Sequence, residues 1–217
     1  MTRPLLVVCA LPTEHHALRG GNWSAARARA GVLRTGMGAV RAHRAMARTL
    51  ARPDAADAAV IASGFCAATD PSIAPGGFVV PDEVWDKSGI VPCPGAEPLA
   101  ELLRAQGLTV HRGVLVSADH VVRGPERAEL HETGAIGVDM ECAATVRVAA
   151  RTDPDRPVAV ARVVVDTPVS ELFRPATIRN GLHAYRALKA AVPAFLEWQA
   201  RTGTDTTTSS ENKAVEA

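Results

Sequence analysis

The chain has 217 residues, of which 47% are hydrophobic and 22% are charged, and its formal net charge is +1. This length and balance fit one globular domain with a buried core. A net charge near zero gives no reason to expect nucleic acid as a partner. No stretch approaches the roughly 20 consecutive apolar residues that a membrane helix needs.

The four cysteines, Cys9, Cys66, Cys93 and Cys142, are widely separated and form no CxxC pair. Three of them lie in apolar strand or helix patterns, which predicts buried, reduced thiols rather than a disulfide framework or a zinc site. We therefore expect a cytoplasmic protein without a metal ion, with any membrane contact limited to the surface.

Short apolar runs rich in β-branched residues predict strands at residues 5–10, 32–35, 58–63, 78–80, 110–116, 135–140 and 158–165. Helical patterns begin near Glu14 and cover residues 39–50, 99–106, 141–151 and 178–199. This alternation predicts a single α/β domain over residues 1–200 with a largely parallel sheet. The Thr- and Ser-rich residues 201–217 are expected to form a disordered tail.

In folds of this type, ligands bind beyond the carboxyl ends of the strands. Two acidic residues, Glu141 and Asp166, stand at such positions and are joined by one helix and one strand. This spacing predicts that they share one rim of the sheet. Taken singly, each could instead be an acid at a helix N-terminus or in a loop.

Three histidines near these segments, His15, His16 and His120, have no metal-site spacing, so surface or pocket-edge positions are expected. Cys66 has an apolar setting and no paired histidine, which favours a buried thiol over a nucleophile. Gly36 and Gly38 resemble a fragment of a dinucleotide-binding fingerprint, but the third glycine and the later acidic residue are lacking, so they are weak evidence for NAD binding.

Five segments, in this order, resemble motifs of the nucleoside phosphorylase/nucleosidase superfamily. They are residues 10–14 (Ala-Leu-Pro-Thr-Glu), 64–68 (Gly-Phe-Cys-Ala-Ala), 117–119 (Ser-Ala-Asp), 138–141 (Val-Asp-Met-Glu) and 162–166 (Arg-Val-Val-Val-Asp). The resemblance covers residues 4–198 and implies a three-layer fold with a mixed, largely parallel sheet between helices. It identifies 64–68 as a Gly-rich loop ahead of a strand.

Within this superfamily, residues 34–38, 117–124 and 134–141 are most similar to the hopanoid-associated phosphorylase group. The resemblance implies removal of adenine from adenosylhopane, which leaves ribosylhopane. It makes Asp166 the general acid at N7 of the leaving purine, a role for which burial at an apolar strand end favours the protonated form. Glu141 would accept hydrogen bonds from the ribose, and Glu14 would serve the attacking water.

The resemblance also implies a set of substrate contacts. Met140 would pack against the sugar, and Val121 and Val122 would flank the base. The remaining substrate-binding residues would be Asp139, Gly64, Phe65 and Ser117.

Phosphorolytic members of the superfamily usually have an arginine two positions before the loop glycine and a serine after it. Here these positions are Ala62 and Phe65, and Glu14 would repel a phosphate dianion. Hydrolysis is therefore favoured and no cofactor is expected. Phosphate stays open as a co-substrate, because Arg34, Arg41 or a neighbouring subunit could still bind it.

Two alternatives stay open. One is a nucleosidase for a small 5′-modified adenosine such as methylthioadenosine, S-adenosylhomocysteine or 5′-deoxyadenosine, and the other is a nucleoside-binding protein without activity. Leu172 and Phe173 are candidates for lining a channel for a lipid-linked substrate. By resemblance, a homodimer or larger homo-oligomer is expected.

Overall fold

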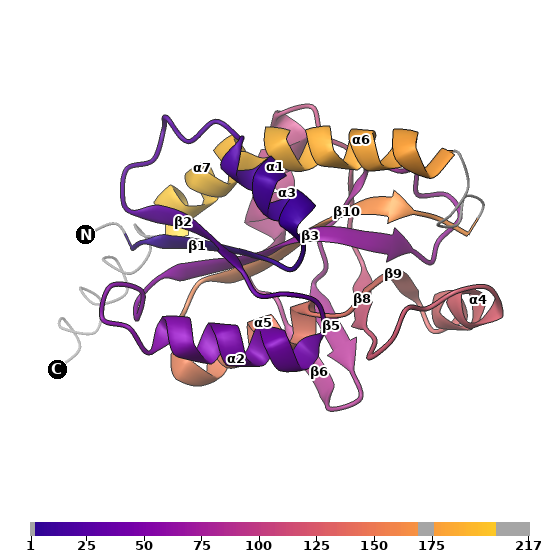
Figure 1. The fold of residues 1–217 in the computed structure, drawn as a ribbon, viewed down its shortest axis with the longest axis horizontal. Helices are drawn as coiled ribbons and strands as arrows, with labels where there is room; N and C mark the ends of the chain where they lie inside the picture. Colours follow the sequence, from indigo (N-terminus) through magenta and orange to yellow (C-terminus); the bar gives the residue numbers. More distant parts are fainter. Residues whose placement is uncertain (1–2, 169–175, 203–217) are drawn as a thin grey trace, which may run out of the picture.

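The computed structural model describes residues 3–168 and 176–202, which form one mixed sheet with helices on both faces (Figure 1). The strands are β1 (Leu5–Cys9), β2 (Ala30–Arg34), β3 (Ala59–Ala68), β4 (Phe78–Val79), β5 (Glu83–Asp86), β6 (Gly89–Pro92), β7 (Val110–His111), β8 (Val114–Ser117), β9 (Ala135–Asp139) and β10 (Val158–Asp166). The helices are α1 (Pro12–Arg19), α2 (Ala39–Leu50), α3 (Ala96–Ala105), α4 (Pro125–Glu132), α5 (Cys142–Thr152), α6 (Ala176–Ala190) and α7 (Val192–Thr202).

Strand β3 lies at the centre of the sheet. It pairs in parallel with β1 and β10, and its last two residues pair antiparallel with β9. Both β3 and β10 are almost continuously apolar because helices cover both of their faces. Six of the nine pairings between described strands are parallel, which confirms the predicted α/β fold with a mixed, largely parallel sheet.

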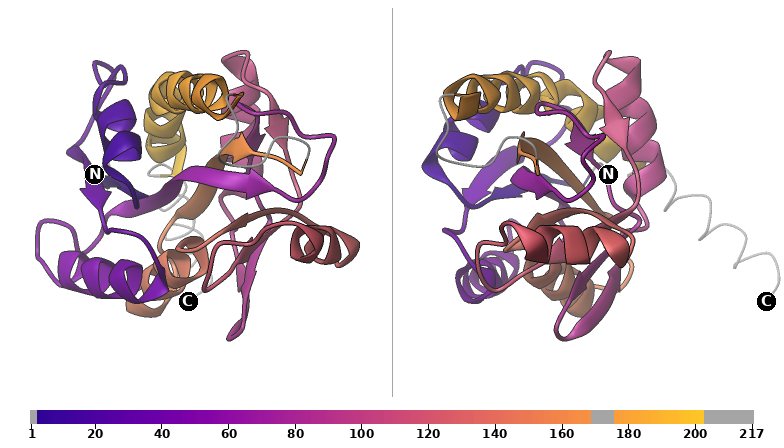
Figure 2. Two further views of the ribbon diagram at one scale, coloured as in Figure 1. Left: turned by 45° about the vertical axis from the view of Figure 1, so that its right-hand side comes forward. Right: turned by 90° about the vertical axis from the view of Figure 1, so that its right-hand side faces the viewer.

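The helices form two outer layers. Helices α1, α3, α6 and α7 lie on one side of the sheet, and α2 and α5 lie on the other, whereas α4 lies beyond the ends of β8 and β9 (Figures 1 and 2). The sequence of α2 explains why one face of this helix is buried. Its apolar residues Ala42, Met46 and Leu50 recur every four residues and form one buried stripe.

The segment 64–68, expected to be a Gly-rich loop, is the second half of β3. Residues 63–67 pair with β10, from Ser63 opposite Ala161 to Ala67 opposite Asp166. Gly64 made this strand hard to predict, because glycine is uncommon inside strands. Where glycine does occur in a strand, it often marks a close approach of other groups. The strand therefore extends to Ala68 rather than ending at Ser63.

Three other expectations about the elements need correction. Residues 110–116 form two strands, β7 and β8, which pair with different partners, β4 and β5. The β5–β6 hairpin and the polar helix α4 were not predicted. The expected helix 178–199 is two helices, α6 and α7, with Pro193 in the first turn of α7, where a missing N–H is tolerated.

Helix α7 continues to Thr202, past the expected end of the domain at residue 200. The rest of the predicted tail, 203–217, lies outside the described residues. Over residues 3–168 and 176–202, every helix is too short or too polar to cross a bilayer.

The arrangement of β9 differs from the βαβ unit predicted from sequence. Both β9 and β10 flank β3, but β9 is antiparallel to β3 and β10 is parallel to it. The chain leaving β9 therefore runs back along β3, and the chain leaving β10 ends opposite Ala67. Glu141 and Asp166 reach one pocket over β3 by this route, rather than from one rim of parallel strands.

Candidate active site

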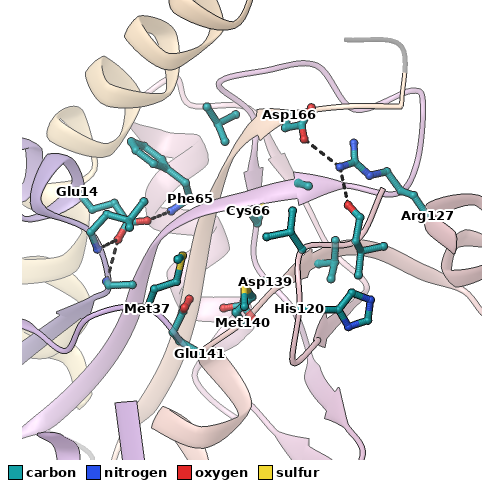
Figure 3. Close-up of a pocket in the computed structure, with 17 residues that line it drawn as sticks. Glu14, Met37, Phe65, Cys66, His120, Arg127, Asp139, Met140, Glu141 and Asp166 are labelled. Atoms are coloured by element: carbon teal, nitrogen blue, oxygen red, sulfur yellow. Dashed lines mark hydrogen bonds and ion pairs between the residues drawn. The ribbon is translucent and has the colours of Figure 1, made fainter. Parts of the chain in front are cut away.

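A pocket lies over the second half of β3, between β9 and β10 (Figure 3). It offers about 150 Å³ to water-sized molecules, roughly ten times what one buried water needs. Met37 and Val121 are about half exposed and stand at its mouth. The pocket is lined by Ala10, Leu11, Glu14, Met37, Phe65, Cys66, Ala67, His120, Val121, Val122, Arg127, Val138, Asp139, Met140, Glu141, Val165 and Asp166.

Most of the residues predicted to act on a substrate meet in this pocket. Eight of the ten line it: Glu14, Phe65, Val121, Val122, Asp139, Met140, Glu141 and Asp166. Gly64 and Ser117 do not line it. Leu172 and Phe173 lie outside the described residues, and neither Arg34 nor Arg41 is part of the lining.

A fully buried arginine of β10, Arg162, lies beneath the pocket floor. Its Nη2 is 2.7 Å from a carboxylate oxygen of Asp139 and 3.6 Å from Oε2 of Glu141. Its Nη1 donates a hydrogen bond to the main-chain oxygen of Ser63. Burying a guanidinium is costly unless it is paired in this way, so Arg162 fixes the carboxylates around it.

Gly64 makes room for this cluster. A β-carbon at this position would lie 2.6 Å from Nη1 of Arg162 and 2.7 Å from Cδ of Glu14, and its φ is +131°. Both the contact distances and the backbone conformation exclude a side chain. The glycine therefore acts on the site through packing.

Glu14 is held in the first turn of α1 and is 1% exposed. Its Oε2 accepts hydrogen bonds from the main-chain N–H groups of Ala10 and Leu11, at 2.8 and 2.7 Å. Its Oε1 accepts another from the N–H of Phe65 at 2.7 Å. Two donors from the β1–α1 connection and one from β3 keep the carboxylate in one orientation at one side of the pocket.

Glu141 precedes α5 and lies below Met37 in the view of Figure 3. Its Oε1 accepts a hydrogen bond from the N–H of Gly38 at 2.7 Å. The pKa of Glu141 is raised to about 7, mainly by burial and also by nearby Asp139, while Arg162 opposes this rise. This carboxyl group can therefore both accept and donate hydrogen bonds near neutral pH.

Asp139 and Ser117 have their polar atoms engaged within the protein. Asp139 accepts hydrogen bonds from the hydroxyl of Ser117 and the N–H of Cys142, and it pairs with Arg162. The hydroxyl of Ser117 in turn accepts from the N–H of Ala143. These contacts tie β8, β9 and α5 together, so the two residues support the pocket wall.

Asp166 lies on the side of the pocket away from Glu14 and is 2% exposed (Figure 3). Its Oδ2 accepts a hydrogen bond from Nη2 of Arg127 at 2.9 Å, and the same nitrogen donates to the main-chain oxygen of Val122 at 3.0 Å. Sequence analysis did not anticipate this ion pair.

The Arg127–Asp166 pair leaves polar atoms unused. Arg127 is 1% exposed, yet its Nε and Nη1, like Oδ1 of Asp166, have no hydrogen-bond partner among the described residues. A buried polar group without a partner costs about 1–3 kcal/mol. Such a cost at a pocket wall is typical of a site prepared for a ligand.

His120 and Cys66 have settings that fit the expectations for them. His120 lies at the pocket edge, where hydrogen bonds to Asp119 and Glu126 raise its pKa. Burial raises the pKa of the Cys66 thiol, which makes a thiolate nucleophile unfavourable. All four cysteines are buried and unpaired. Within the described ranges, no three His, Cys, Asp or Glu side chains are placed to hold a metal ion.

Arg127 is the main residue that sequence analysis missed. Helix α4 has hardly any apolar periodicity, so periodicity could not reveal it. A usable signal was Pro125 directly after Gly124, because proline is favoured in the first turn of a helix. That signal would have placed Arg127 in the first turn of a helix.

The comparison with protein families agrees with this geometry. Residues 11–193 match the family model of the phosphorylase superfamily. The chain belongs to the phosphorylase superfamily. This membership confirms the family predicted from the motifs and its enzyme class, nucleoside cleavage. No curated protein matches the sequence.

Solved structures share the fold at low sequence identity. A 5′-methylthioadenosine/S-adenosylhomocysteine nucleosidase from Neisseria meningitidis, in complex with methylthio-immucillin-A, is 20% identical over 90% of this chain and 99% of its own, with a TM-score of 0.71. A putative methylthioadenosine nucleosidase from Weissella paramesenteroides is 19% identical over 91% and 98%, with a TM-score of 0.74. Futalosine hydrolase from Helicobacter pylori is 15% identical over 93% and 98%, with a TM-score of 0.70.

Replacing Gly64 by alanine should damage both stability and activity. The added methyl group would clash with Arg162 and Glu14, so we expect the free energy of unfolding to fall by about 2–4 kcal/mol. Urea unfolding followed by circular dichroism measures this change. Gly31→Ala is the matched control, because a β-carbon there meets nothing within 4 Å. Equal stabilities of the two variants would contradict the packing role.

The pKa of Glu141 predicts how stability depends on pH. Because its folded value of about 7 exceeds the ordinary value of 4.5, the folded state binds the proton more tightly. Wild-type stability should therefore fall, relative to Glu141→Gln, as pH rises from about 4.5 to about 7, by on the order of 3 kcal/mol.

Urea unfolding of the two proteins between pH 5 and pH 8 tests this dependence. A stability difference that stays constant over this range would show that Glu141 titrates at its ordinary value.

Proposed function

We propose that this enzyme hydrolyses the N-glycosidic bond of a 5′-modified adenosine, with adenosylhopane as the substrate. The observation that supports this best is the placement of three carboxylates around one pocket. Glu14 and Asp166 lie on opposite sides, and Glu141 lies on a third side, below both in the view of Figure 3. This arrangement fits a nucleophile, a leaving base and a ribose around one substrate.

The environment of Glu14 favours water over phosphate as the nucleophile. Arg127 is the single arginine in the pocket lining over the described residues, and it pairs with Asp166 away from Glu14. A phosphate dianion beside Glu14 would meet a carboxylate and lack the guanidinium that normally holds it. A water molecule can instead donate a hydrogen bond to Glu14. No cofactor is required for this reaction.

The proposed reaction has a simple balance. The C1′–N9 bond breaks, its electron pair passes to the base, and water adds to C1′ while giving a proton to Glu14. Glu141 accepts hydrogen bonds from the ribose hydroxyls. Asp166, held by Arg127, hydrogen-bonds the leaving base, which takes its proton from solvent as Glu14 returns its own.

The apolar lining supports a hydrophobic 5′ substituent. Leu11, Met37, Phe65, Val121 and Met140 line the pocket, and Met37 and Val121 are about half exposed at its mouth. A substituent leaving through this mouth would meet apolar surface. Together with the motifs shared with the hopanoid-associated group, this favours a lipid-linked nucleoside. We place the enzyme in the cytoplasm as a homo-oligomer that meets such a substrate at a membrane surface.

A second candidate substrate is methylthioadenosine or S-adenosylhomocysteine. Two of the three solved structures described above are named as nucleosidases for methylthioadenosine. The pocket groups assigned to water, ribose and base would serve that substrate equally.

Adenine release distinguishes these assignments. Purified protein is incubated with adenosylhopane, methylthioadenosine and 5′-deoxyadenosine, each with and without phosphate, and adenine is measured by chromatography. We expect release from adenosylhopane in phosphate-free buffer, with oxygen from ¹⁸O-labelled water at C1′. Phosphate-dependent release would overturn water as nucleophile. Release from the small nucleosides alone would overturn the lipid-linked substrate.

Substitution of the two carboxylates tests their roles. Glu14→Gln and Asp166→Asn should each lower kcat by about 10²–10⁴-fold, while the Kd of the substrate changes by less than about tenfold, because each replacement keeps the size of the side chain. Glu132→Gln on the exposed side of α4 is the control and should match the wild type. Unchanged kcat in either variant would remove that residue from the mechanism.

A further inference from the structure

A cationic groove lies on the side of the sheet that α2 and α5 cover, outside the candidate active site. The described residues that line it include five cationic side chains and one carboxylate. They are Arg44, Arg48, Lys87, Arg147, Arg151 and Asp86. The chain as a whole is nearly neutral, with 24 basic and 23 acidic residues, so this excess of positive charge is local. Such a surface attracts an oppositely charged partner.

Two neighbouring helices supply most of this charge. Helices α2 and α5 pack against each other beside the β5–β6 hairpin (Figures 1 and 2), and neither helix contains an aspartate or a glutamate. Helix α2 contributes Arg44 and Arg48, and α5 contributes Arg147 and Arg151. Each pair is spaced by four residues, a spacing at which like charges destabilise a helix. The groove therefore concentrates arginines at a cost to the stability of both helices.

The protein neutralises only part of this charge. Arg147 forms a bidentate ion pair with Asp86, with N–O distances of 2.6 and 2.8 Å. Lys87 lies 3.3 Å from Asp119, and both side chains are exposed. The other three arginines of the groove are exposed and form no ion pair with any described residue. These three guanidinium groups are available to a partner.

Exposed apolar side chains accompany the cations. Val40 lines the groove and is 72% exposed, and Ile90, in the hairpin whose turn lines the groove, is 61% exposed. Met37, at the mouth of the active-site pocket, lies three residues before Val40, so at most about 11 Å separates their Cα atoms. The groove and the mouth of the pocket are therefore neighbours.

We propose that the groove between α2 and α5 docks on an anionic membrane surface and so brings the mouth of the pocket to the bilayer. Arg44, Arg48 and Arg151 contact lipid phosphates, and Val40 and Ile90 reach the boundary between headgroups and acyl chains. This inference rests on the proposed function for its lipid-linked substrate and names the surface through which the enzyme meets it.

Other occupants fit this surface less well. A second copy on a twofold axis would place the same arginines of two protomers opposite each other, and like charges across an interface repel. A nucleic acid would pair its phosphates with the arginines but would leave Val40 and Ile90 against charged groups. An anionic membrane has partners for both kinds of side chain.

Co-sedimentation of the full chain with vesicles tests the docking surface. The vesicles contain phosphatidylglycerol and phosphatidylcholine in equal parts, or phosphatidylcholine alone. We expect the wild type to partition at least about tenfold more strongly onto the anionic vesicles, because each basic side chain near such a surface contributes about fivefold. This preference should be lost at about 1 M salt, where the Debye length is about 3 Å.

A pair of double variants assigns the binding to this groove. Arg44→Gln/Arg48→Gln should lower the partition coefficient on anionic vesicles by about ten- to thirtyfold. Arg19→Gln/Arg186→Gln is the matched control, because it removes the same charge from exposed positions of α1 and α6 on the other side of the sheet. The control should lower the coefficient by less than about threefold, because its arginines lie away from the docked membrane.

The outcomes separate this inference from the proposed function. A wild type that binds neither kind of vesicle would overturn the docking surface, whereas adenine release from detergent-dispersed adenosylhopane tests the proposed function independently. Equal losses in the two double variants would show that binding follows net charge alone and would also overturn it.

Two further measurements test the other occupants. A lower oligomeric state of Arg44→Gln/Arg48→Gln in analytical ultracentrifugation, with no vesicle binding by the wild type, would assign the groove to a contact between copies. Tighter binding to a DNA duplex than to the anionic vesicles would assign it to nucleic acid. Either result would overturn the membrane as the partner.

Discussion

The pocket depends on one buried cation, the guanidinium of Arg162. It pairs with Asp139 and lies 3.6 Å from Glu141. Glu14 also lies close to it, because Gly64 has no side chain to occupy the space beside them. Without a buried positive charge, carboxylates concentrated at the end of an apolar strand would repel one another and be poorly solvated. Because Arg162 belongs to the central strand β10, its position is set by the sheet itself. The geometry of the sheet therefore also sets the positions of the carboxylates in the site.

The carboxylates around the pocket differ in environment, and this difference separates their chemical roles. Glu14 accepts three main-chain hydrogen bonds, which fix the orientation of its carboxylate. Glu141 is buried with an opposing cation and a neighbouring acid, which raises its pKa to about 7. Asp166 has its own arginine, Arg127. These three carboxyl groups therefore differ in role. Glu14 can orient water, Glu141 can both donate and accept hydrogen bonds, and Asp166 forms an ion pair.

The sequence predicted the elements that have a clear apolar pattern, such as β1, α2 and β10, and most of the residues it assigned to the substrate line the pocket. It failed where the pattern is weak or ambiguous. Gly64 made a central strand look like a loop, because sequence alone does not reveal that Arg162 and Glu14 fill the space beside it. The roles of Asp139 and Ser117 were equally hidden, since hydrogen-bond partners across strands are set by register rather than by spacing along the chain.

The register of β9 explains why residues far apart in sequence meet at one pocket. Antiparallel pairing with the end of β3 sends the chain after β9 back along β3, which brings Glu141 to the N–H of Gly38, directly before α2. Parallel pairing of β10 with β3 places Asp166 opposite Ala67 instead. The two acids therefore face one apolar floor from different directions. A low-polarity floor strengthens each interaction with a charge that develops above it, so the geometry of the strands sets both the spacing of the groups and the strength of their effect.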